Sequence, residues 1–124
     1  MQVNSQIEVL LARYAREYSD FDGLTLADVN QHGYGEDVPI HIAARHGLLG
    51  DIRLLVEAGA RINELGDLGF TSLRYAAMMG QVDAVKLLVE LGANTQARNE
   101  YGQTPLVVAR LGDHNDVVQF LQTL

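Results

Sequence analysis

The sequence predicts an all-α solenoid, in which helix–turn–helix units stack on one another and loops project from one side. Three observations predict it: a motif that recurs every 33 residues, apolar residues at i, i+3 and i+4 within each unit, and glycines at the turns. One such unit cannot bury its own apolar face, so neighbouring units must stack. The composition suits a globular chain, since 48% of its 124 residues are hydrophobic and 20% are charged.

The repeat is visible in three aligned segments. They read VPIHIAA at residues 38–44, TSLRYAA at residues 71–77 and TPLVVAR at residues 104–110. Glycines keep the same step at Gly47 and Gly80, and at Gly59 and Gly92. Glycine adopts the positive φ that ends a helix in a tight turn. Because no insertion breaks the step, we predict units over residues 34–66, 67–99 and 100–124.

These segments resemble the ankyrin repeat family over residues 34–124. The matching stretches are VPIHIAARHG…IRLLVEAGARIN, TSLRYAAMMG…VKLLVELGANTQ and a shortened TPLVVARLGDHNDVVQFLQ. The resemblance implies an ankyrin-repeat solenoid that binds another protein. It also implies a structural role for His41, whose ring would connect the turns of adjacent units. Arg74 and Val107 replace histidine at the matching positions.

Within each unit, the sequence predicts a short first helix and a second helix with the larger apolar face. Thr71 and Thr104 can cap the first helices, and Pro105 suits the first helical position. The apolar residues of the second helices are Ile52, Leu55, Val56, Val85, Leu88 and Val89. In the third unit Asp113 occupies the place of the turn glycine. Either that turn is distorted or Asp113 itself adopts the left-handed conformation.

The two ends of the chain are predicted to be caps. Residues 1–33 are interpreted as a degenerate first unit with a helical cap, whose start is indicated by a capping box at residues 5–8. One face of this helix is apolar: Ile7, Leu10, Leu11, Tyr14, Ala15 and Tyr18. A short second helix is expected near residues 24–29. In the last unit, polar Asn115 and Gln122 replace apolar residues, as a terminal cap requires.

Composition argues against several classes of protein. The chain has no cysteine, which excludes disulfides and thiolate metal sites. Its net charge of −7, with Lys86 as the single lysine, argues against binding to nucleic acid. No apolar run reaches the roughly 20 residues that span a bilayer. The first residues also lack the pattern of a secretory signal, so we expect a cytoplasmic protein that does not bind membranes.

No pattern indicates catalysis, a metal site or a cofactor. His41 and His46 are five residues apart, which is a poor spacing for metal ligands on one helix. The segment Gly33-Tyr34-Gly35 is too short for a phosphate-binding loop. We therefore expect a protein that is not an enzyme and has no cofactor. An enzyme is a remote alternative, because the sequence does not assign residues 19–35 to a structure.

Partner binding is expected at positions that the repeat leaves free. In the resembling family these lie on the concave face, which consists of the loop tips and the exposed sides of the first helices. The candidates in the loops are Tyr34, Asp37, Asp67, Leu68, Phe70, Glu100, Tyr101 and Gln103. The candidates on the helices are Arg45, His46, Met78, Met79 and Leu111. The apolar members form the expected contact patch, with an acidic border at Glu36, Asp37, Glu64, Asp67 and Glu100.

These features predict a module that binds and occludes a partner protein and is monomeric when free. The acidic border would suit a basic partner. Small size and acidity suggest a narrower hypothesis, a bacterial immunity-type inhibitor of a cognate toxin. The alternative is a structural adaptor, or a homo-oligomerising piece of a scaffold in which the apolar patch is buried between copies.

Overall fold

The computed structural model describes residues 2–124, which form helices and loops without any β-strand in that range. The helices are α1 (Gln2–Glu17), η1 (Ser19–Phe21), α2 (Pro39–His46), α3 (Leu49–Glu57), η2 (Asp67–Gly69), α4 (Ser72–Met78), α5 (Val82–Glu90), α6 (Pro105–Leu111) and α7 (Asn115–Gln122), of which η1 and η2 are 3-10 helices. This architecture confirms the predicted all-α solenoid.

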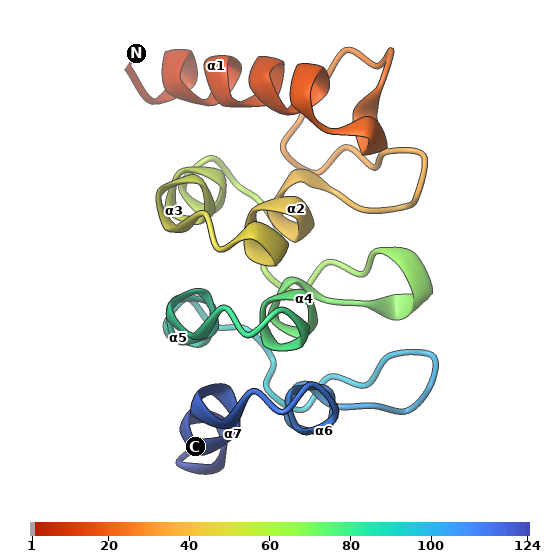
Figure 1. The fold of residues 1–124 in the computed structure, drawn as a ribbon. Helices are drawn as coiled ribbons and strands as arrows, with labels where there is room; N and C mark the ends of the chain where they lie inside the picture. The colour runs from red at the N-terminus through yellow and green to blue at the C-terminus, as the bar shows by residue number, and fades with distance from the viewer. Residues whose placement is uncertain (1) are drawn as a thin grey trace.

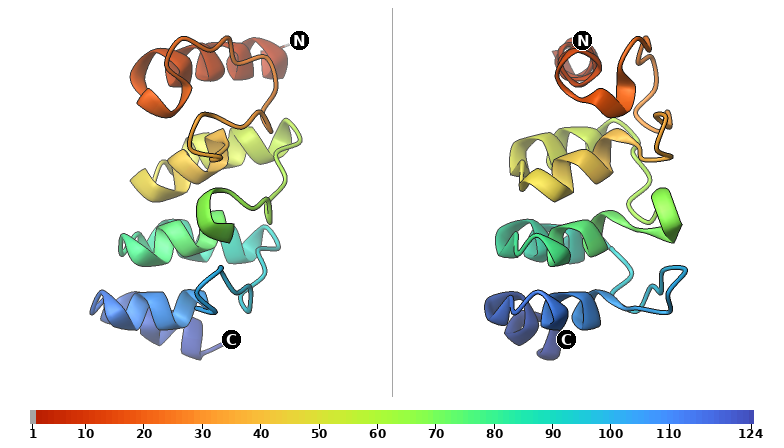
Figure 2. Two further views of the ribbon diagram at one scale, coloured as in Figure 1. Left: turned by 90° about the vertical axis from the view of Figure 1, so that its right-hand side faces the viewer. Right: turned by 45° about the vertical axis from the view of Figure 1, so that its right-hand side comes forward.

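The helices form two parallel columns. Figure 1 shows α2, α4 and α6 stacked in one column and α3, α5 and α7 in the other, with α1 across the N-terminal end. The loops before α2, α4 and α6 project to the same side of the stack (Figure 2). This arrangement places the exposed sides of α2, α4 and α6 next to the loops. These surfaces together are termed the concave face, as in the sequence analysis.

Apolar contacts between successive units form the core. Ile52, Leu55, Val85 and Leu88 are fully buried where α3 and α5 pack together. Fully buried alanines line the first helices, at Ala43, Ala44, Ala76, Ala77 and Ala109. Small side chains at these positions let neighbouring helices approach closely. Arg110 occupies the repeat position of Ala44 and Ala77, but it is exposed. The outer side of α6 is therefore polar at this position.

The turns follow the 33-residue step. Gly47 and Gly80 both have φ of 68°, and Asp113 has φ of 56°. Asp113 therefore adopts the left-handed conformation itself. Aspartate tolerates this region better than most residues.

Side chains also connect each unit to the next through backbone groups. The Gln81 side chain donates to the carbonyl of Arg45 at 3.2 Å, and His114 Nε2 donates to the carbonyl of Met78 at 2.8 Å. Both donors and both acceptors are 33 residues apart. The register between units is thus fixed by hydrogen bonds as well as by apolar packing.

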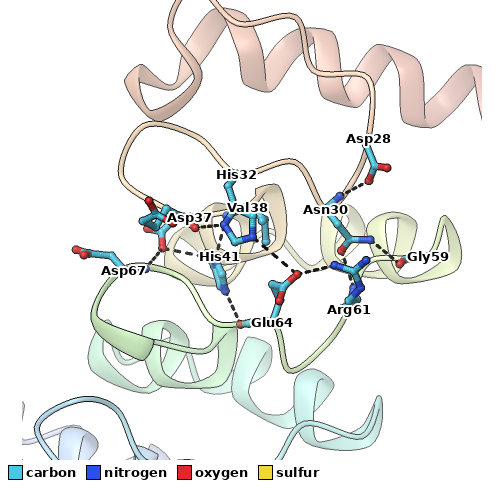
Figure 3. Close-up of polar contacts among 11 residues, drawn as sticks. Asp28, Asn30, His32, Asp37, Val38, His41, Gly59, Arg61, Glu64 and Asp67 are labelled. Atoms are coloured by element: carbon cyan, nitrogen blue, oxygen red, sulfur yellow. Dashed lines mark hydrogen bonds and ion pairs between the residues drawn. The ribbon is translucent and has the colours of Figure 1, made fainter.

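His41 has the structural role that the resemblance implied (Figure 3). Its Nδ1 accepts the backbone N–H of Val38 at 3.0 Å, and its Nε2–H donates to the carbonyl of Glu64 at 2.8 Å. These two bonds require a neutral ring protonated at Nε2. Burial lowers the pKa of His41, although the Glu64 carbonyl and the Asp37 carboxylate act in the opposite direction.

Two predictions about the N-terminal cap were wrong. Helix α1 begins at Gln2, so Ser5 lies within the helix rather than at its N-cap; no glycine or proline in that stretch stops the helix. The short helix expected near residues 24–29 is absent. There the Gln31 side chain bonds the Ala27 N–H and the Thr25 carbonyl, which replaces helical hydrogen bonding. The predicted apolar face of α1 is confirmed, since Leu10, Leu11 and Tyr14 are buried.

The core packing predicts the stability of one variant. Leu88→Ala should lower the free energy of unfolding by roughly 2–5 kcal/mol, because Leu88 is fully buried and truncation leaves a cavity. Urea denaturation measures the change, with Leu65→Ala as the control at an exposed leucine. Equal stability of the two variants would contradict the assigned core.

The first loop carries a strained residue. Glu36, Gly69 and Gly102 occupy one position of the repeat and have φ of 74°, 72° and 73°. A non-glycine residue in this region lowers the free energy of unfolding by about 1–2 kcal/mol through backbone strain. Glycine lowers it by up to about 1 kcal/mol, because glycine increases the conformational entropy of the unfolded chain. We expect Glu36→Gly to leave thermal stability unchanged or raise it, and Glu100→Gly, at an exposed residue without positive φ, to lower it. A melting temperature that is lower for Glu36→Gly than for Glu100→Gly would refute the assignment of backbone strain to Glu36.

The buried ring of His41 predicts a pH dependence. Burial lowers the pKa of His41 in the folded protein. At pH values below the ordinary histidine pKa of about 6.5, His41 is therefore protonated more readily in the unfolded chain than in the folded protein. Stability is therefore lost as pH falls from 7 to about 5.5, by at most about 1.4 kcal/mol per pH unit from this group. Replacing it in His41→Gln should flatten that slope in urea titrations. His46→Gln serves as the control on the same helix, and an unchanged slope in His41→Gln would refute the assignment.

Candidate functional site

The structure removes two residues from the expected contact surface. Asp37 and Phe70 are only 4% and 8% exposed. The Asp37 carboxylate accepts the Tyr75 hydroxyl at 2.8 Å and the backbone N–H of Asp67 at 3.1 Å. Phe70 packs edge-on against Tyr75, with ring centroids 5.6 Å apart. Both side chains therefore connect the loops to α4 and are not available to a partner.

Burial of Tyr75 and its bond to Asp37 both raise the pKa of the tyrosine hydroxyl. The phenol thus remains a neutral donor to a buried carboxylate. This satisfies a charge that would otherwise be costly inside the fold. Asp37 lies 3.5 Å from His41 Nδ1, which places it in the same polar cluster (Figure 3).

The remaining candidates differ in exposure. Met79, Tyr34, Tyr101 and Leu111 are exposed large side chains, with Leu111 reaching 70%. Asp67 and Glu100 are exposed, whereas Leu68, Met78, Gln103 and Arg45 are half-buried. His46 is exposed but stacks on Tyr18 at a centroid distance of 5.4 Å, which connects α2 to the cap.

One apolar residue of this surface was missed by the sequence analysis. Val107 on α6 is 39% exposed and occupies the position of His41 in the last unit. Four exposed apolar residues are here termed the apolar patch: Met79 at the C-cap of α4, Tyr101 in the third loop, and Val107 and Leu111 on α6. Val107, like Arg74 in the middle unit, stands where the first unit has His41, and this departure from the repeat was the available signal.

The centre of the concave face is charged. Arg74 on α4 lies with its guanidinium carbon 3.6 Å from the Phe70 ring centroid and 5.9 Å from that of Tyr75. Arg45 approaches Tyr75 from α2, with its guanidinium carbon 5.2 Å from the centroid. Burial lowers the pKa of Arg74, but a guanidinium remains protonated at neutral pH.

The acidic border is narrower than the sequence indicated. Glu36, Asp67 and Glu100 are exposed, but Glu64 is engaged within the fold. Its carboxylate accepts Arg61 at 2.8 Å and lies 3.9 Å from His32 Nε2 (Figure 3). Three loop carboxylates, Glu36, Asp67 and Glu100, therefore remain exposed in the acidic border.

A second surface lies between α1 and α3. There a groove of about 620 Å³ is lined by residues that include Val9, Leu10 and Leu54. Arg13 and Tyr14 bond to Asp51 across the same two helices, with 2.8 Å between Tyr14 and Asp51 oxygens. Val9 is 70% exposed, as Leu111 is, so the two residues form a matched pair for experiments.

The described part of the chain contains neither a metal-binding cluster nor a membrane-spanning helix. No three His, Asp or Glu side chains come together there in a way that could hold a metal ion. Among the helices described, none is long and apolar enough to cross a membrane.

Comparison with known proteins identifies the family. A family model described as ankyrin repeats (3 copies) matches residues 9–99 and 40–123. A search of curated proteins found no match to the chain. Ankyrin repeats are protein–protein interaction modules, and the matched segments contain the three helix pairs and most of the cap. The chain belongs to the ankyrin repeat family.

Proposed function

We propose that this protein binds one partner protein through its concave face and acts by covering the partner's surface. The observation that carries the proposal is the apolar patch. Met79, Tyr101, Val107 and Leu111 are exposed although the fold buries the residues that its repeat requires. Aromatic and methionine side chains anchor many protein interfaces, and gathered apolar residues on a monomer often mark a contact site.

The charge of the chain supports a partner with a basic surface. The net charge is −7, and Asp67 and Glu100 lie in exposed loops beside the patch. Opposite charge would steer such a partner and favour its orientation on the concave face. The narrower form of the proposal is an immunity-type inhibitor, which would occlude a basic active site such as that of a nuclease toxin.

Affinity capture with matched variants tests the binding surface. Immobilised wild-type protein is compared with Leu111→Asp and with Val9→Asp, which change two side chains of equal exposure. A charge in the centre of an apolar contact is costly. We expect a host protein that wild type and Val9→Asp retain, and that Leu111→Asp retains at least about tenfold less.

Two results would contradict the proposal. If Val9→Asp fails to retain the partner and Leu111→Asp retains it, the binding surface is the groove between α1 and α3. A concentration-dependent dimer in sedimentation that Leu111→Asp disrupts would favour the scaffold alternative, in which copies bury the patch. Inhibition of the captured partner's activity at one-to-one stoichiometry would support the narrower form.

A further inference from the structure

Two arginines in the centre of the concave face have unmet hydrogen-bonding capacity. The Nε–H groups of Arg45 and Arg74 are covered by the protein and have no acceptor among the residues that the structure describes. No carboxylate within residues 5–124 forms an ion pair with Arg74. Its one side-chain hydrogen bond is to the Met78 sulfur at 2.7 Å, and thioethers are weak acceptors.

The position of these side chains is fixed without an anion. The guanidinium of Arg74 stacks on Phe70, and its stem is held on α4 next to Tyr75. Arg45 has one distant carboxylate, with 3.9 Å between its Nη2 and Asp20 Oδ2. Stacking on aromatic rings holds a planar guanidinium in place while its terminal nitrogens can still donate. Since Nε is covered and the residue is half-exposed, an incoming acceptor would meet the terminal Nη groups of Arg74.

We propose that Arg74, assisted by Arg45, binds the carboxylate of one aspartate or glutamate side chain of the partner protein. The inference rests on the proposed function and specifies the chemistry at the middle of that interface. A carboxylate is the acceptor whose geometry matches a guanidinium through two parallel hydrogen bonds. Because Met78 and Leu111 continue the same helix position as Arg45, apolar neighbours of that acidic residue would contact them.

The surrounding charge makes this contact selective. Asp67 and Glu100 in the adjacent loops repel an acidic surface as a whole. They tolerate a single carboxylate that reaches the arginines from a neutral or basic surrounding. The partner is therefore expected to present one acidic residue, flanked by apolar side chains, within a basic surface. Arrangements of this kind reject wrong partners as well as attract the right one.

Arginine-detected NMR tests the inference without the partner. The probes are acetyl-Leu-Glu-Leu-amide and the matched acetyl-Leu-Gln-Leu-amide, added to wild type, Arg74→Gln and Arg53→Gln. A covered Nε–H exchanges slowly with water, so the Arg74 resonance is observable. We expect the glutamate peptide to shift it saturably and the glutamine peptide to bind at least about tenfold more weakly. Arg74→Gln should remove that preference, and Arg53→Gln, an exposed arginine on α3, should retain it.

The outcomes separate this inference from the proposed function. Equal shifts of the Met79 and Leu111 signals by both peptides would overturn the carboxylate site while leaving concave-face binding intact. Saturable shifts confined to the groove between α1 and α3 would overturn both. Absence of any saturable shift up to about 20 mM peptide would also refute the carboxylate site, since a dissociation constant near that concentration would already give half of the full shift.

Discussion

Every other feature of this protein depends on one constraint: a helix pair exposes an apolar face that only the next pair can cover. The 33-residue step satisfies it by placing fully buried Leu55 and Leu88 at equivalent points of successive units. The same step aligns the hydrogen bonds from Gln81 and His114 to carbonyls of the preceding unit. Positions that face a neighbour are thereby determined by the fold, and the others can serve a partner.

This constraint explains which parts of the fold could be predicted from the sequence. Helices and turns follow from local patterns repeated three times, and Gly47, Gly80 and Asp113 all adopt the left-handed conformation. The N-terminal cap occurs once, so no second copy corrected its interpretation. Around residues 24–29, bonds from the Gln31 side chain to the backbone take the place of the short helix that was expected there.

The candidate site was less predictable because the burial of a loop residue depends on contacts with the neighbouring unit, which the repeat pattern does not show. Asp37, Phe70 and Gln103 share one repeat position, and each closes its loop by a carbonyl bond, as between Gly33 N and Asp37 O at 2.8 Å. Tyr75 and the following loop cover Asp37. The Gln103 side chain instead accepts from Asn99 at 3.0 Å and remains half-buried.

Departures from the repeat also supply the proposed binding face. In the first unit His41 is buried and bonds to Glu64, whereas Val107 at the equivalent position of the last unit is exposed. Arg74, at that position in the middle unit, is half-buried on Phe70 without a carboxylate in the described chain. Departures from the repeat thus gather on one side of α4 and α6, and this side can recognise a partner without disturbing the stack.

The central claim is that this side of α4 and α6 is the contact surface, and methionine methyl NMR tests it most directly. Met78 and Met79 are two of only three methionines in the chain, and Val9→Met adds a reporter at the groove between α1 and α3. Adding the captured partner should shift the methyl signals of Met78 and Met79 and leave that of the Val9→Met reporter unchanged. A shift of the reporter with unchanged Met78 and Met79 signals would contradict the account.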